Sequence, residues 1–303
     1  MNNLKSKINR LERVFDLEKI LQIRPDKRYI QNYYKINKLP YSILHSKENL
    51  IHMGVSKGSE FNPNDLYYFT QQISEYIEKR KLKNILELGS GRGANSSYLA
   101  KKFSDVKFVG IDFSQAQLDF AKDYSTKVDN LKFQKGDYHD LKDFEDESID
   151  LCFVIEALCY SNNPKAVFNE VRRVLKPNGL FYIADGYLKK DRDKMSKEDE
   201  IVKRLIEVGM AVDNIKQYDE QDKIATDSGF KQLAEEDVSM NIIPTVQRFE
   251  RLAKIYLRLG VFAKVLNKLL PQQFILNLLS GYLLKDAINS DLASYMITVY
   301  SKK

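Results

Sequence analysis

The sequence of 303 residues contains no tryptophan, only two cysteines and only three histidines. Two cysteines cannot form the disulfide framework of a small secreted domain, so Cys152 and Cys159 are expected to be reduced thiols. The histidines, His45, His52 and His139, do not have the spacing of metal ligands, and no metal is expected. These scarcities argue against the disulfide-rich and zinc-binding classes of protein.

Long uncharged segments are also missing. No run of about 18 residues lacks a charged side chain, so no transmembrane helix is expected. The first residues are polar and charged, without the apolar stretch of a signal peptide. These features predict a cytoplasmic protein, with attachment to a membrane surface as an alternative. The net charge of +6 is spread along the chain, which does not indicate a nucleic-acid partner.

The stretch NILELGSGRGANSSYLA, residues 84–100, is the most informative part of the chain. Its apolar start, residues 85–88, predicts a buried strand that stops at glycine. Gly89, Gly91 and Gly93 follow at every second position and allow the backbone to approach a ligand closely. A helix then begins, and its first N–H groups are unpaired. Strand, glycine turn and helix start together predict a nucleotide-binding element.

Three acids accompany the predicted strands at equal spacing. Glu87 lies in the first strand, and Asp112 and Asp137 follow 25 and 50 residues later at the ends of the next two. This spacing is typical of successive β-α units with short loops. Asp112 is placed to accept hydrogen bonds from a ribose diol, and Asp137 from an adenine amine. Phe113 and Tyr138, which directly follow these acids, offer apolar faces for the adenine.

The segments E-L-G-S-G-R-G, G-I-D-F-S and G-D-Y resemble the first three motifs of class I S-adenosylmethionine (SAM) dependent methyltransferases. The resemblance implies an α/β, Rossmann-like sheet of seven mostly parallel strands, with helices on both faces. It also implies SAM as the cofactor, S-adenosylhomocysteine as its product, and no metal. The glycine spacing GxGxG differs from the GxGxxG of dinucleotide enzymes, and no Walker-type lysine is present. The implied cofactor-binding residues are Glu87, Gly89, Ser90, Gly91, Gly93, Asp112, Phe113, Gln117, Gly136, Asp137, Tyr138 and Ile155.

A second resemblance begins at the fourth predicted strand, residues 148–154. Carboxyl ends of such strands line the ligand crevice, so Glu156 and Tyr160 are candidates to face the transferred methyl group. The alternative is a turn acid and a packed aromatic ring. The run V-I-E-A-L-C-Y-S-N-N-P, with V-R-R-V-L-K-P-N-G after it, is similar to sterol and tocopherol methyltransferases. Leu158 and Tyr160 replace a small polar residue and a histidine of that pattern, so the base role of that histidine does not carry over.

An aromatic segment precedes the core and contains Tyr33, Tyr34, Tyr41 and His52. It resembles the segment that folds over SAM and the acceptor in sterol, tocopherol and cyclopropane-type methyltransferases. The alternative is a loop packed by its own aromatic rings. Together with the fourth strand, this segment completes the set of catalytic candidates: Glu156, Tyr160, Tyr34, Tyr41 and His52.

The expected organisation has three parts: a helical cap in residues 1–60, the SAM-binding core in 61–188, and 189–303, which completes the sheet and adds a helical lid at about 243–288. In the cap, an amphipathic helix from Leu4 to Ile20 either packs on the core or rests on a membrane. We expect Asn64 to cap a helix within residues 61–80, and strands five, six and seven at 180–184, 237–240 and 292–300.

The apolar stretch from Phe249 to Leu284 predicts two or three helices. It resembles the substrate lid of the tocopherol methyltransferase group. A structural helical pair is one alternative. Docking on a membrane surface is another, because basic side chains flank the apolar ones. These are Lys254, Arg258, Lys264 and Lys268.

The reading that accounts for most of these features is a SAM-dependent methyltransferase of a small hydrophobic acceptor, with methylation at carbon favoured. The acceptor would be an isoprenoid, sterol, quinone or tocopherol-like compound. N- or O-methylation of an alkaloid, amine or polyketide, and methylene transfer to lipid double bonds, are alternatives. A non-catalytic SAM-binding scaffold is a further one. Nucleic-acid methylation is disfavoured because Ile155-Glu156-Ala157 stands where such enzymes carry an Asn/Asp-Pro-Pro-aromatic motif.

Overall fold

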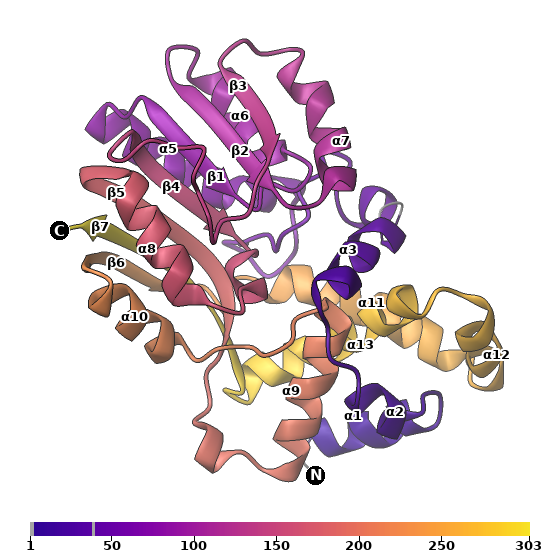
Figure 1. Cartoon of the computed structure of the whole chain (residues 1–303). Coiled ribbons are helices and arrows are strands. Elements are labelled where there is room, and N and C mark those ends of the chain that lie inside the picture. Colours follow the sequence, from indigo (N-terminus) through magenta and orange to yellow (C-terminus); the bar gives the residue numbers. More distant parts are fainter. Residues whose placement is uncertain (1–2, 38–39) are drawn as a thin grey trace.

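The computed structural model describes residues 3–37 and 40–303. A seven-stranded sheet, in the order β3-β2-β1-β4-β5-β7-β6, runs through the molecule (Figure 1). Strands β1 to β5 are parallel, and β7 pairs antiparallel with both β5 and β6. This is the predicted Rossmann-like sheet. Its strands are β1 Asn84–Leu88, β2 Lys107–Asp112, β3 Leu131–Lys135, β4 Ile149–Ile155, β5 Leu175–Leu188, β6 Phe230–Asp237 and β7 Ala293–Lys302.

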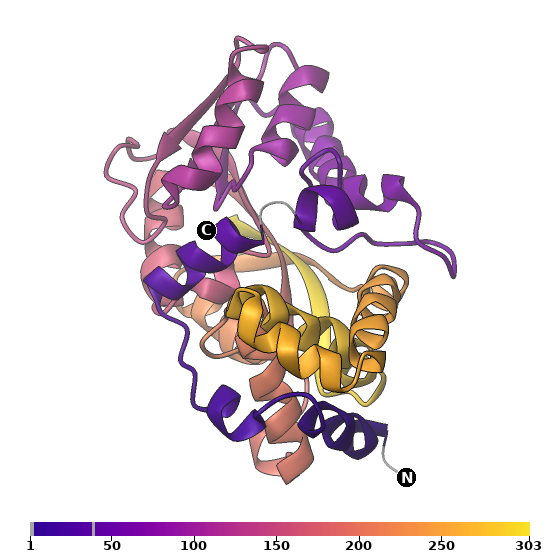
Figure 2. The ribbon, with the colours of Figure 1, turned by 90° about the vertical axis from the view of Figure 1, so that its right-hand side faces the viewer.

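Helices cover both faces of the sheet and extend beyond its carboxyl edge (Figures 1 and 2). Those of the N-terminal part and of the core are α1 Asn3–Glu12, α2 Leu17–Leu21, α3 Lys27–Ile36, α5 Tyr68–Arg80, α6 Ala94–Lys102, α7 Gln115–Ser125 and α8 Pro164–Val174. The later ones are α9 Lys197–Met210, α10 Tyr218–Asp227, α11 Ile243–Arg258, α12 Val261–Leu269 and α13 Gln272–Asn289.

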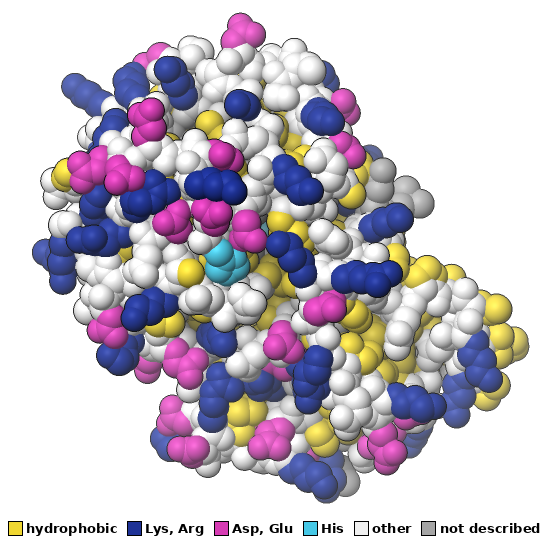
Figure 3. All heavy atoms as spheres, viewed as in Figure 1, with side chains coloured by type: hydrophobic (Ala, Val, Ile, Leu, Met, Phe, Trp, Pro, Cys, Tyr) yellow, Lys and Arg dark blue, Asp and Glu magenta, His cyan; other side chains and the backbone are white. Residues whose placement is uncertain are grey.

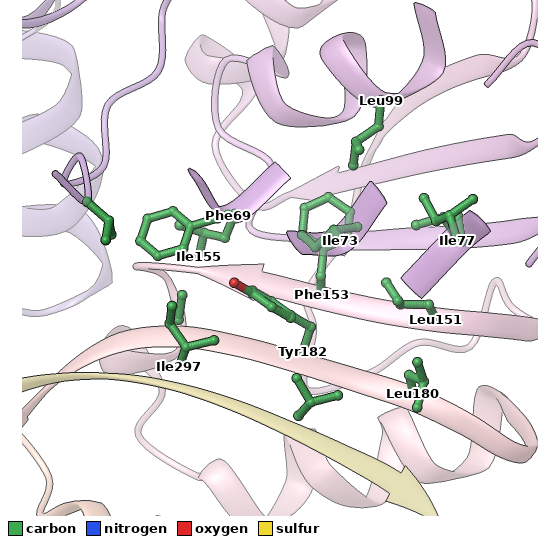
Figure 4. Packing of buried hydrophobic residues seen from close by; sticks show 14 of the residues in the cluster. Phe69, Ile73, Ile77, Leu99, Leu151, Phe153, Ile155, Leu180, Tyr182 and Ile297 are labelled. Atoms are coloured by element: carbon green, nitrogen blue, oxygen red, sulfur yellow. The ribbon is translucent and has the colours of Figure 1, made fainter. Parts of the chain in front are cut away.

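Strand β4 shows how the sheet is held between its two helical layers. Successive side chains of a strand point to opposite faces. Leu151 and Phe153 pack in the core cluster that includes Ile73 of α5 (Figure 4). Cys152 belongs to the opposite cluster, with Phe168 of α8. Because the strand is buried on both faces, its sequence reads as a continuous apolar run.

A further cluster joins the beginning of the chain to its later helices. Leu4, Ile8 and Leu11 of α1 are buried against α9 and α13. Lys7 is buried as well, and its ammonium group lies 2.8 Å from Glu250 Oε1 on α11. Of the two sequence interpretations of this segment, the structure shows the packed one.

Four predicted boundaries were wrong. The N-terminal amphipathic segment is two helices, because Asp16 caps α2 by accepting a hydrogen bond from Lys19 N. The cap of the 3-10 turn Pro63–Tyr67 before α5 is Asn62 and not Asn64, since proline occupies the first position after it. Of the predicted run 237–240, only Asp237 belongs to β6, which spans Phe230–Asp237, and residues 239–240 lie in a turn.

The fourth is the end of the fifth strand, which we placed at residue 184. Strand β5 continues to Leu188, since it pairs with β7 over that length. In the described part of the chain, no helix is both long and apolar enough to cross a membrane.

Candidate functional site

A cavity of about 710 Å³ opens at the carboxyl ends of β1, β2, β4 and β5. Helix α3, the segment 41–53, α11 and α13 provide its other walls. All of the residues predicted to bind cofactor or to act in catalysis line it, with the exception of Gly93. Gly93 lies beneath the wall, where a Cβ would meet Phe133 Cζ at 2.4 Å, so its role is in packing.

The glycine turn forms a cradle at the floor of the cavity. Gly89 and Gly91 have φ of 67° and 51°, a region that L side chains rarely adopt. A Cβ on Gly89 would lie 2.5 Å from Ala157 Cβ, so this glycine is required by packing. A Cβ on Gly91 would meet only Ile51 Cδ1, at 3.9 Å, and would occupy space in the cavity.

Glu87 and Asp112 hold this cradle in place. Glu87 accepts hydrogen bonds from Asn95 Nδ2 at 3.2 Å and from Ser96 Oγ at 2.5 Å. Asp112 accepts from the N–H of Gly91 at 2.9 Å, and its other oxygen accepts from Ser114 N. Burial raises the pKa of Glu87 to about 7 and that of Asp112 to about 6, although these donors oppose the shift.

Two buried polar atoms beside the cradle have no hydrogen-bond partner among the described residues. They are Gln117 Nε2 and Ser90 Oγ, and both residues line the cavity. Buried polar groups in proteins are rarely left unpaired, so these atoms fit a polar ligand. The cradle, the two acids and these two groups therefore suit a nucleoside ligand such as SAM.

The third predicted acid, Asp137, lies at the rim of the cavity and already has partners. Its Oδ1 accepts from the backbone N–H of His139 at 3.1 Å and lies 2.6 Å from His139 Nδ1. Its Oδ2 lies 3.1 Å from Lys27 Nζ, which is also 5.3 Å from the centre of the Phe113 ring. Sequence reasoning did not single out Lys27 or His139 for this site. Helix α3 thus reaches the cofactor side of the cavity through Lys27.

Glu156 follows β4 in a strained conformation, with φ of 49°. Its Oε1 accepts hydrogen bonds from Met53 N at 2.6 Å and from the Tyr295 phenol at 2.9 Å. The other oxygen, Oε2, has no hydrogen-bond partner in the described part of the chain. Burial, together with the nearby charge of Asp185, raises the pKa of Glu156 to about 7, although the two hydrogen-bond donors oppose the shift. Met53 and Tyr295 are functional candidates that the sequence analysis missed.

Asp185, on β5, is a second buried carboxyl group in the same wall. It accepts hydrogen bonds from the N–H groups of Cys159, at 2.9 Å, and of Gly186, at 2.8 Å. Burial raises the pKa of Asp185 to about 6. Glu156 and Asp185 are therefore two neighbouring carboxyl groups of this wall whose charges repel each other.

Four tyrosines from three parts of the chain meet above these acids: Tyr33 and Tyr34 of α3, Tyr41 of the segment 41–53, and Tyr160 of the turn after β4. The Tyr34 hydroxyl donates to Tyr160 at 2.9 Å, and Tyr160 donates to the carbonyl of Met210 at 3.1 Å. Tyr33 and Tyr41 form a second hydroxyl pair at 2.5 Å. Burial raises the pKa of all four phenols, which keeps them neutral. The structure thus brings the predicted Tyr34, Tyr41 and Tyr160 together and adds Tyr33.

His52 lines the cavity, but both of its ring nitrogens are occupied within the protein. Nε2 lies 3.1 Å from Asn95 Oδ1, and Nδ1 lies 3.0 Å from the carbonyl of Met53. Burial lowers the pKa of His52, and its ring packs edge-on against Phe69. This arrangement suits a residue that positions the 52–53 backbone better than one that exchanges protons with a ligand.

Arg92, inside the glycine motif, is buried in the cavity wall and was not predicted as a site residue. Its Nη1 donates to Ser42 Oγ at 2.7 Å and to Asn49 Oδ1 at 3.0 Å. The guanidinium lies 4.9 Å from the centre of the Phe120 ring. Arg92 therefore ties the segment 41–53 to the cradle. Among the residues that the structure describes, no three His, Cys, Asp or Glu side chains are grouped as metal ligands.

The far half of the cavity is apolar. Its lining comes from α9, α11 and α13, helices that pack on one another and on α1. Because these helices leave few polar groups in that part of the wall, it suits an apolar molecule. The lining side chains there are Ile206, Met210, Phe249, Leu252, Phe274, Leu278, Leu284 and Ile288.

Comparison with known families and structures agrees with this geometry. The family model described as "Methyltransferase domain" matches residues 79–243, which is more than half of the chain. Sterol 24-C-methyltransferase of Neurospora crassa is 27% identical over 187 residues, which cover 59% of this chain. The chain spans only 49% of the length of that relative.

Solved structures show the same fold. The cyclase SpnF superposes with a TM-score of 0.69 at 17% identity and covers 92% of this chain and 97% of its own. Geranyl diphosphate C-methyltransferase from Streptomyces coelicolor superposes with a TM-score of 0.64 at 15% identity. The superposition covers 95% of this chain and 97% of that one. The fold and the cavity thus define a class I, Rossmann-like nucleoside-binding protein. The chain belongs to the SAM-dependent methyltransferase family, and its cofactor is SAM.

Proposed function

We propose that this protein transfers the methyl group of SAM to a carbon atom of a small apolar acceptor of the isoprenoid or sterol type. One observation carries the proposal. A single cavity is lined by the glycine cradle, by the apolar side chains of α9, α11 and α13, and by Glu156 and the four tyrosines. The names of a relative and of a structural neighbour, a sterol 24-C-methyltransferase and a geranyl diphosphate C-methyltransferase, support the choice of carbon and of acceptor class.

When bound, SAM supplies an electrophilic methyl group on a sulfonium. Gly89 to Gly91 and Asp112 would hold its adenosine part, and the unpaired Gln117 amide and Ser90 hydroxyl would complete its hydrogen bonds. The protein's main task is to align the acceptor's double bond with this methyl group and to exclude water. The apolar walls of α11 and α13 serve that task.

Glu156 would then stabilise the charge that develops on the acceptor. The π-electron pair of the acceptor's double bond would take up the methyl group that SAM supplies, which would leave a positive charge on the neighbouring carbon. The faces of Tyr34 and Tyr160 support such a charge by cation–π attraction. The open Oε2 of Glu156 accepts the proton that leaves, and a double bond is restored.

The cap and the lid have matching roles in this proposal. Residues 1–60 provide Tyr33, Tyr34 and Tyr41 and the Met53 N–H that orients Glu156. The helices at about 243–288 provide the apolar wall. The core 61–188 binds the cofactor. The acceptor site would therefore be built from all three parts of the chain.

The reaction can be tested with methyl-labelled SAM and pooled acceptors, read by mass spectrometry. The pools are sterols, prenyl phenols and quinones, prenyl diphosphates, amines, and unsaturated acyl lipids. We expect one added methyl group on carbon of an isoprenoid-type acceptor. Label on the nitrogen of an amine, or a methylene bridge in an acyl chain, would overturn the proposed acceptor. SAM binding by calorimetry with no labelled product in any pool would contradict the reaction itself.

A further inference from the structure

Helix α12 carries an apolar stripe on its solvent side. Val261, Phe262, Val265 and Leu269 are 75%, 76%, 51% and 74% exposed, whereas Ala263 is fully buried. Their spacing places these four side chains on one face of the helix. In Figure 3, apolar atoms gather at the projecting end of the molecule that α12 forms in Figure 1. Exposed apolar patches of this kind mark contact surfaces.

The charges around this stripe are of one sign. No aspartate or glutamate occurs between residues 251 and 285. Lys264 and Lys268 lie one helical turn apart beside the stripe, and Arg258 ends the preceding helix; all three are exposed. None of the three has an ion-pair partner among the described residues. The surface therefore offers apolar side chains bordered by free positive charge.

Helix α12 also adjoins the cavity wall in sequence, although none of its own residues lines the cavity. Helix α12 connects α11 to α13, the two helices that line the apolar half. Phe249 and Leu252 line it before α12, and Phe274 and Leu278 do so directly after. The stripe therefore lies on the segment that joins two helices of the apolar wall.

We propose that α12 docks on the anionic surface of a lipid bilayer, with the stripe inserted at the acyl boundary and Lys264, Lys268 and Arg258 against lipid phosphates. A second copy of the chain is a poorer occupant, because a two-fold axis through the stripe would bring its lysines together. The proposal goes beyond methyl transfer. Its test uses neither SAM nor an acceptor, so the two proposals succeed or fail separately.

The test is flotation of the full chain with vesicles of phosphatidylcholine, with and without phosphatidylserine. We expect the wild-type protein to float with the anionic vesicles and to be released by salt. The double variant Phe262→Gln, Leu269→Gln should bind roughly ten-fold or more weakly. In the double variant Lys264→Gln, Lys268→Gln, the affinity for anionic vesicles should fall about five-fold per lysine removed. Its binding to vesicles without phosphatidylserine should not change.

Matched controls remove the same chemistry elsewhere. Met240 and Leu233 are 65% and 42% exposed and lie away from α12, so Met240→Gln with Leu233→Gln should leave flotation unchanged. The exposed pair Lys132→Gln and Lys231→Gln controls for net charge. Equal flotation of the α12 variants and wild type, or no flotation of wild type, would overturn the proposal. Self-association of wild type that the α12 variants abolish, with no flotation, would assign the stripe to a second copy.

Discussion

The phenol of Tyr295 on β7 donates a hydrogen bond of 2.9 Å to Oε1 of Glu156, a residue 139 positions earlier in the chain. The N–H of Met53 donates to the same oxygen at 2.6 Å. Three distant parts of the chain therefore meet at one carboxyl oxygen. Because both partners are donors, they fix the orientation of Glu156 and leave Oε2 for the cavity. This relationship makes the role of the acid testable without disturbing the fold.

Glu156→Gln should lower turnover by about 100-fold or more, because it removes a general base but keeps an oxygen that can accept both hydrogen bonds. The affinity for SAM, measured by calorimetry, should stay within a few-fold of wild type. Glu236→Gln is the matched control, since Glu236 also accepts from a tyrosine, Tyr68 at 2.9 Å, but on the surface. Unchanged turnover in a folded, SAM-binding Glu156→Gln protein would make the acid structural only.

The raised pKa of Glu156 predicts how stability depends on pH. A carboxyl with a folded pKa of about 7, against an ordinary pKa of 4.5, favours the folded state while it is protonated. That contribution is complete below pH 4.5 and is lost as the pH rises through 7. At 1.36 kcal/mol per pH unit the loss is about 3 kcal/mol. In urea unfolding between pH 4 and pH 8, the free energy of unfolding of Glu156→Gln relative to wild type should therefore increase as the pH rises. Parallel curves for the two proteins would contradict the raised pKa.

Substitutions in the hydrogen-bonded pair Tyr34 and Tyr160 can separate the role of the aromatic ring from that of the hydroxyl group. Tyr160→Phe leaves the Met210 carbonyl and the Tyr34 hydroxyl without their partner, so it should cost about 1–3 kcal/mol of stability. Tyr34→Phe removes only one donor and should cost about 1 kcal/mol. If the aromatic faces support a cation, both Phe variants should keep turnover within about ten-fold, whereas Tyr34→Leu should lose more. Equal turnover of Tyr34→Phe and Tyr34→Leu would exclude the aromatic role.

The two glycines of the cradle should respond differently to the same change. Gly91→Ala adds a Cβ that points into the cavity, so we expect a folded protein whose SAM dissociation constant rises about ten-fold or more. Gly89→Ala places its Cβ 2.5 Å from Ala157 Cβ and should destabilise the fold itself. Thermal unfolding and calorimetry on both variants distinguish these effects. A Gly91→Ala protein with normal SAM affinity would place the cofactor elsewhere in the cavity.

The cofactor side of the site could be predicted because its signals are local. The glycine turn and Asp112 lie within one β-α-β unit, and the turn connects directly to the strand and helix that position it. Tyr295 and Lys27 had no such signal. Tyr295 reaches Glu156 only because β7 pairs with β5, and Lys27 reaches Asp137 only because α3 folds back over the sheet. Single-sequence reasoning does not reveal contacts of that separation.

The misplaced boundaries have equally local causes. Strand β6, FKQLAEED, is an edge strand exposed over most of its length, so it lacks the apolar alternation that marks a half-buried strand. The run 237–240 follows the Gly229 turn and contains the apolar Val238 and Met240, which predicts a strand where only Asp237 belongs to β6. In the turn before α5, Pro63 occupies the first helical position, so the cap is Asn62 and not the predicted Asn64.

The position of β7 between β5 and β6 bears on how the protein is made. Ribosomes deliver the chain from its first residue onward, so the strand that closes the sheet is also the strand translated last. Until residues 293–302 leave the exit tunnel, β6 has no strand to pair with, and Glu156 lacks its hydrogen bond from the phenol of Tyr295. A nascent chain arrested before that point could form the glycine cradle and its acids. It could not yet assemble the place where we propose the acceptor reacts.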